Sequence, residues 1–143
     1  MKILIVYKSI LGATKRYAVW LGEETGADIM GFSQVKPDSF DKYKVVAVAS
    51  GTYAGQMPLI SFLKKYWYTL AKKKVVIIAV GTIPPQDRES TMSFELIPKE
   101  IREKVTYFKL PGRMLSGTPD ETLMKQKLKP VVKKLKSFAK LKQ

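Results

Sequence analysis

The sequence predicts a doubly wound α/β domain, in which helices cover both faces of a five-stranded parallel sheet. Three continuous apolar runs rich in β-branched residues are typical of strands buried on both faces: residues 2–7, 44–49 and 74–80. Helical patterns lie between most strands, as the crossovers of a parallel sheet require. With 143 residues, 45% of them apolar, the chain fits one domain over residues 1–143.

After the first apolar run, Thr14 is expected to cap a helix that runs to about Thr25 and ends at Gly26. A short strand is expected at residues 28–32. The next connection, residues 34–43, is short and contains a proline, so a loop or a brief helical turn has to make that crossover.

The second helix is expected to begin near Pro58, because proline is favoured in the first turn. Its predicted buried side carries Ile60, Leu63, Trp67 and Leu70. A weaker helix is expected near residues 98–103. Residues 105–110 alternate in polarity, which indicates a strand at a sheet edge with one wetter face.

A long final helix is expected over residues 120–141, and Pro130 is expected to kink or divide it. Its predicted buried stripe consists of Met124, Leu128, Val131, Leu135 and Phe138. Its many lysines belong to the opposite, solvated side, which could also touch anionic lipid.

Two absences limit the chemistry. The chain has no Cys, which excludes thiolate nucleophiles and sulfur ligation of zinc or iron. It has no His, which removes the usual general base and the commonest metal ligand. We therefore predict no catalytic side chain and no metal site, and any redox chemistry requires a bound cofactor.

Ligands of open parallel sheets lie at the carboxyl ends of the strands, where three loops rich in Gly, Ser and Thr are expected. The first loop follows the first strand and precedes a helix, so its backbone N–H groups and hydroxyls could surround a phosphate. Its residues are Ser9, Ile10, Leu11, Gly12, Ala13 and Thr14.

The second loop places an aromatic residue, Tyr53, where it could stack on a flat heterocycle. Its residues are Ser50, Gly51, Thr52, Tyr53, Ala54 and Gly55. The third loop could present backbone groups to the edge of a ring, and consists of Gly81, Thr82, Ile83 and Pro84.

Together these loops resemble those of the flavodoxin family over nearly the whole chain. The family's phosphate loop, Thr/Ser-x-Thr-Gly-x-Thr, is matched at Ser9, Gly12 and Thr14 and departs at Leu11, where a hydroxyl is usual. The second loop is matched at Thr52, Tyr53, Gly55 and Pro58, and the third at Gly81 and Thr82.

The resemblance implies strand order 2-1-3-4-5 and FMN as cofactor. The first loop would hold the FMN phosphate, Tyr53 would stack on the isoalloxazine ring, and residues 81–84 would face its other side. The protein would then serve electron transfer or a small flavin-dependent oxidoreduction. Two alternatives remain: a flavodoxin-like module without FMN that acts in protein binding, and a membrane-associated oxidase resembling the flavodoxin-like protoporphyrinogen oxidases.

The formal net charge of +14 favours an acidic partner, such as a redox protein, or an anionic membrane surface. The same charge is also compatible with a basic solvated surface of no specific role. Nucleic acid is not expected, since Arg is scarce and no nucleic-acid-binding module is recognised. We expect a cytoplasmic protein, with peripheral association with the inner face of the membrane as an open alternative.

Overall fold

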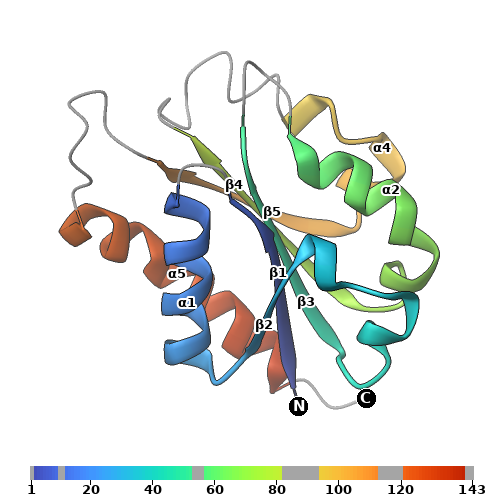
Figure 1. Cartoon of the computed structure of the whole chain (residues 1–143), viewed down its shortest axis with the longest axis horizontal. Helices are drawn as coiled ribbons and strands as arrows, with labels where there is room; N and C mark the ends of the chain where they lie inside the picture. The colour runs from blue at the N-terminus through green and yellow to red at the C-terminus, as the bar shows by residue number, and fades with distance from the viewer. Residues whose placement is uncertain (1, 10–11, 53–56, 82–93, 113–120, 141–143) are drawn as a thin grey trace.

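Helices pack on both faces of a five-stranded parallel sheet in the computed structural model, which describes residues 2–9, 12–52, 57–81, 94–112 and 121–140 (Figure 1). The strand order is β2-β1-β3-β4-β5, and every neighbouring pair is parallel. The predicted order 2-1-3-4-5 is therefore confirmed. The strands are β1 (Ile3–Lys8), β2 (Asp28–Gly31), β3 (Val45–Gly51), β4 (Lys74–Gly81) and β5 (Val105–Pro111).

The helices form one layer on each side of the sheet, as Figure 1 shows. One face is covered by α1 (Ala13–Thr25) and α5 (Glu121–Ala139), and the other by α2 (Pro58–Leu70) and α4 (Lys99–Arg102). Successive residues of the central strands alternate between the two cores. Val46 and Val48 of β3 face α2, whereas Val45, Ala47 and Ala49 face the α1–α5 layer.

The short connection between β2 and β3 consists of two brief turns, η1 (Phe32–Gln34) and η2 (Pro37–Phe40). Lys73, just after α2, holds the second turn in place by donating hydrogen bonds to the backbone oxygens of Phe40 and Tyr43, at 2.9 and 2.6 Å. β5 lies at the sheet edge, as predicted. All its residues except Leu110 are half-buried, so the predicted alternation between a wetter and a drier face does not appear.

Three further local predictions differ from the structure. Thr14 does not cap α1: the capping residue is Gly12, and Thr14 lies buried inside the first turn. The buried side of α2 carries Leu59, Phe62, Leu63, Tyr66 and Leu70, so Ile60 and Trp67 lie at its margin. Pro130 does not divide α5, which is one continuous helix.

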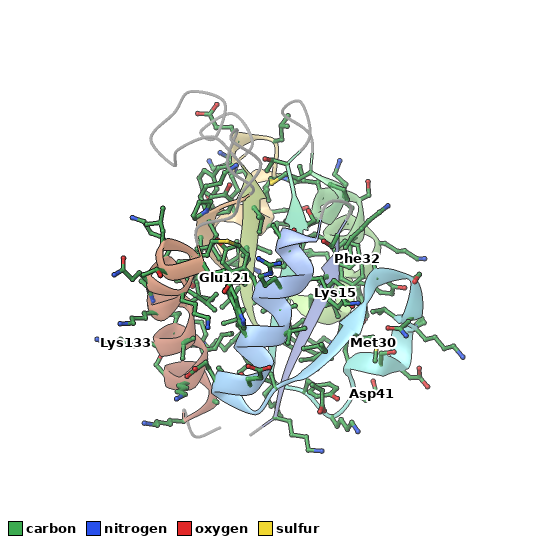
Figure 2. The ribbon with its side chains drawn as sticks, turned by 60° about the vertical axis from the view of Figure 1, so that its left-hand side comes forward. Lys15, Met30, Phe32, Asp41, Glu121 and Lys133 are labelled. Atoms are coloured by element: carbon green, nitrogen blue, oxygen red, sulfur yellow. The ribbon has the colours of Figure 1, made fainter. Side chains whose placement is uncertain are left out.

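The first turns of α1 and α5 are joined by an ion pair, in which Arg16 Nη1 lies 3.4 Å from Glu121 Oε1. Both side chains are exposed, so the pair stabilises the fold by less than about 1 kcal/mol. Figure 2 shows Glu121 at this end of α5 and Lys133 on its outer side.

No helix among the described residues is both long and apolar enough to cross a bilayer.

Candidate functional site

The carboxyl ends of β1, β3 and β4 lie side by side at one edge of the sheet. The register pairs Lys8 with Ser50, and Ser50 with Ala79, so the first two predicted loops begin next to each other and β4 ends beside them. Of the predicted site residues, the structure describes Ser9, Gly12, Ala13, Thr14, Ser50, Gly51, Thr52 and Gly81. The others lie outside the described residues: Ile10, Leu11, Tyr53, Ala54, Gly55, Thr82, Ile83 and Pro84.

The first loop leads directly into the N-terminus of α1. Gly12 adopts a left-handed conformation, with φ 94°, which L side chains rarely tolerate. Its N–H donates a hydrogen bond to Ser9 Oγ at 3.1 Å, which closes the turn. The N-terminus of a 13-residue helix carries partial positive charge and unpaired N–H groups, so this turn is suited to hold a phosphate.

The side chain of Tyr17 connects this helix to the carboxyl end of the edge strand β5. Its hydroxyl donates a hydrogen bond to the backbone oxygen of Pro111, at 2.5 Å. Burial raises the pKa of Tyr17 above its usual range, which extends to more alkaline pH the range over which the hydroxyl is a donor. The position of the α1 N-terminus is thereby coupled to the end of β5.

Ser50, in the second loop, has a structural partner. Its side chain is fully buried, and Oγ accepts the N–H of Leu59 at 3.2 Å, in the first turn of α2. The same hydroxyl lies 3.2 Å from the backbone oxygen of Gly51, to which it donates. Ser50 therefore caps α2 across the loop, and its hydroxyl is already engaged within the protein.

Gly81 ends β4 at a point where three segments approach closely. A Cβ atom there would lie 2.5 Å from Thr52 Oγ1 and 3.1 Å from Lys109 Nζ, so a larger residue would force the side chains of Thr52 and Lys109 to move. The N–H of Gly112 also donates to the Gly81 oxygen, at 2.5 Å. Close packing with Thr52 and Lys109 thus favours a glycine here, independently of any ligand.

One cation near the site was not anticipated from the sequence. Lys109 of β5 donates a hydrogen bond from Nζ to Thr52 Oγ1, at 3.3 Å, and so brings positive charge to the ends of β3 and β4. The register places Lys109 opposite Ala79, two residues before Gly81. A lysine within an alternating edge strand is the only sequence signal, and that signal does not show which loop the side chain reaches.

Comparisons with known proteins agree with this architecture. The family model described as a flavodoxin domain matches residues 4–136. No curated protein sequence matches the chain. Among solved structures, oxidised flavodoxin 2 from Bacillus cereus is similar with a TM-score of 0.67 and 17% identity, over 96% of this chain and 99% of that one. A flavodoxin from the domain Archaea has a TM-score of 0.61 and 20% identity, over 95% and 99% of the two chains. At such identities the structures show a shared fold.

Proposed function

This chain belongs to the flavodoxin domain family, and from that premise we propose that it binds FMN and serves electron transfer or a small flavin-dependent oxidoreduction. The observation that carries the proposal is the start of α1. There a turn closed by Ser9 and Gly12 leads into a helix N-terminus at the carboxyl end of β1, beside the ends of β3 and β4. This is where open parallel sheets bind phosphate-containing ligands.

Under this proposal, residues 9–14 hold the FMN phosphate, Tyr53 stacks on the ring, and residues 81–84 face its other side. FMN supplies the capacity to accept and release electrons. The protein binds the cofactor, orients it and limits its contact with water. No side chain is required as an acid or base for simple electron transfer.

The test is a titration of the cofactor-free protein with FMN, followed by quenching of flavin fluorescence. We expect saturable binding at micromolar FMN or tighter. Tyr53→Ala should weaken binding by about tenfold or more, because base–aromatic stacking contributes roughly 1–3 kcal/mol in nucleotide-binding proteins. Tyr68→Ala is the matched control, since Tyr68 lies on α2 with 86% of its surface exposed; its affinity should equal that of the wild type.

Absence of saturable FMN binding by a folded protein would overturn the proposal and favour a flavodoxin-like module that acts in protein binding. Leu11 is the feature that keeps this second function open, since it removes one hydroxyl from the phosphate loop.

We further propose an acidic redox partner for the basic surface. The outer side of α5 exposes lysines along its length, with Lys133 pointing away from the sheet in Figure 2. Lys125, Lys127, Lys129, Lys133 and Lys136 are all exposed. Glu23 and Glu24 of α1 line the same groove as Lys125, Lys129, Lys133 and Lys136, so positive charge is in excess on this surface but is partly offset. An excess of one sign accelerates docking of an oppositely charged protein, and salt weakens that effect. Co-sedimentation with anionic vesicles tests the alternative, a membrane surface, and strong binding there would contradict the protein-partner assignment.

A further inference from the structure

A groove of about 770 Å³ opens beside the phosphate-loop turn, on the α2 side of the sheet. Three segments form its walls: the end of β1 with Lys8 and the following Ser9, the η1 turn with Phe32, and the N-terminal part of α2 with Ser61 and Lys65. This size is within the range of roughly 300–1,000 Å³ typical of small-molecule sites.

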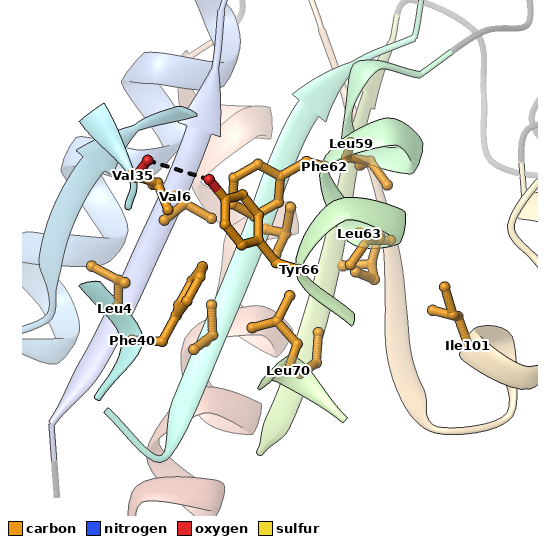
Figure 3. Close-up of a cluster of buried hydrophobic side chains, with 14 of the residues drawn as sticks. Leu4, Val6, Val35, Phe40, Leu59, Phe62, Leu63, Tyr66, Leu70 and Ile101 are labelled. Atoms are coloured by element: carbon orange, nitrogen blue, oxygen red, sulfur yellow. Dashed lines mark hydrogen bonds between the residues drawn. The ribbon is translucent and has the colours of Figure 1, made fainter. Parts of the chain in front are cut away.

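The floor of the groove is a preformed aromatic surface. Phe32 stacks on Phe62, with ring centroids 4.3 Å apart and planes at 21°. Tyr66 packs against Phe62 at 4.8 Å and donates a hydrogen bond from its hydroxyl to the Val35 oxygen, at 3.3 Å (Figure 3). Phe62 and Tyr66 are each less than 9% exposed and are fixed by the core, and the half-buried Phe32, stacked on Phe62, is the most accessible of the three rings.

The η1 wall of the groove is fixed as well. Gln34 Oε1 accepts the N–H of Gly31 at 2.9 Å, which closes the turn that carries Phe32. The backbone N–H of Val35 donates to the Phe32 oxygen at 3.2 Å. The wall is therefore held by its own hydrogen bonds, which reduces the ordering needed when a ligand binds.

The charge of the groove has one sign. Lys8 and Lys65 come from different elements and both line the groove, and none of the described residues lining it is acidic. Lys65 Nζ lies 5.3 Å from the centroid of the Tyr66 ring, so the ammonium group stays close to the aromatic floor. The exposed Ser33 and Ser61 add hydroxyl groups at the rim.

We propose that this groove is a second binding site, for a small molecule that combines a flat ring with an anionic group. The ring would lie on the aromatic floor, and a carboxylate, sulfonate or phosphate would meet Lys8 and Lys65. Ser9, which lines the groove, belongs to the first loop predicted to hold the flavin, and Pro58, which also lines it, follows the second. Binding in the groove does not require a flavin; only the placement of the ligand beside one rests on the proposed function.

The test compares two probes of the same shape, naphthalene-2-sulfonate and the uncharged 2-naphthylmethanol. Each is titrated into FMN-free and FMN-saturated protein, and backbone amide shifts are followed by NMR. The sulfonate should bind saturably, shift the amides of residues 31–35 and 59–66, and bind about tenfold tighter than the alcohol, as one additional charge contact would provide.

Two neighbouring lysines of α2 provide the matched variants. Lys64 and Lys65 are both exposed, but only Lys65 lines the groove. Lys65→Glu should weaken sulfonate binding about tenfold or more, whereas Lys64→Glu, with the same change in net charge, should alter it less than about twofold. Both substitutions are at solvated positions and should leave the fold intact.

Three results would overturn the proposal. Equal losses in the two variants would mean that only the general positive field attracts the probe, and equal affinity for the alcohol would remove the anionic requirement. Displacement of the sulfonate by FMN would make the groove part of the flavin site. Failure of FMN to bind anywhere, with the sulfonate still bound in the groove, would retire the proposed function and leave this inference standing.

Discussion

Gly12 and Gly26 flank α1 at its two ends, and both adopt a left-handed backbone conformation. Substitution of either should destabilise the protein, but only Gly12 lies at the predicted phosphate turn. Both have positive φ, at 94° and 73°, and among the described residues, chain neighbours apart, no atom lies within 4 Å of the position that a Cβ would take. The cost of a side chain at either position is therefore a backbone cost, and not a steric clash with a neighbour.

We predict that Gly12→Ala and Gly26→Ala each lower the free energy of unfolding by about 1 kcal/mol, because alanine disfavours the left-handed region. Urea unfolding measures this effect. Only Gly12→Ala should also weaken FMN binding, since Gly26 lies at the opposite end of the helix. Equal losses of affinity in both variants would show that helix stability, and not the phosphate turn, controls binding.

Ser50 illustrates how a residue in a predicted ligand loop can have a structural task. We predict that Ser50→Ala lowers the free energy of unfolding by about 1 kcal/mol, because the buried N–H of Leu59 loses its acceptor. Ser137→Ala is the control: Ser137 is exposed and its hydroxyl donates to the Lys134 oxygen within α5. Chemical denaturation of both should show less than about 0.5 kcal/mol for the control; a similar loss in both would remove the capping role.

At the scale of elements, α5 is continuous through Pro130 although proline lacks the N–H that a helix interior requires. The apolar stripe outweighs this defect, since Met124, Leu128, Val131 and Leu135 are all buried against the sheet. Tertiary packing thus holds a helix that local propensity would interrupt.

Pro130→Ala is therefore expected to stabilise the protein, by about 1–3 kcal/mol, because it restores one helical hydrogen bond at an exposed position. Thermal unfolding measures the shift. Lys129→Ala at the adjacent exposed position should change stability by less than about 0.5 kcal/mol. A lower melting temperature for Pro130→Ala would mean that the proline has a favourable role in packing.

At the scale of the whole molecule, the formal charge of +14 acts on any bound redox group. Positive potential favours the more negatively charged, reduced state of a cofactor. We predict that the FMN-loaded protein has a reduction potential less negative than that of acidic flavodoxins, and that it becomes more negative as salt screens the charge. Redox titration at low and high ionic strength tests both; an equally low, salt-independent potential would contradict the prediction.

The sequence correctly predicted most helices and strands, but not the burial and contacts of several side chains. The strands β1, β3 and β4 were located because continuous β-branched runs are favourable in a sheet buried on both faces, whatever surrounds them. The buried side of α2 was predicted only in part: Leu63 and Leu70 are buried as expected, whereas Ile60 and Trp67 lie at the margin. Which of its apolar residues face the core depends on how α2 sits against β3 and η2.

The sequence by itself determined the doubly wound fold, the order of its elements and the start of three loops at the carboxyl ends of the strands. These features follow from local patterns and from the geometry of parallel sheets. Only the tertiary structure decided which side chains these loops leave available. Ser50 is engaged by α2, Gly81 is crowded by Thr52 and Lys109, and Lys8 and Lys65 line the same groove. These residues are brought together by tertiary packing and not by their local sequence. Local sequence patterns therefore cannot predict which of them come close.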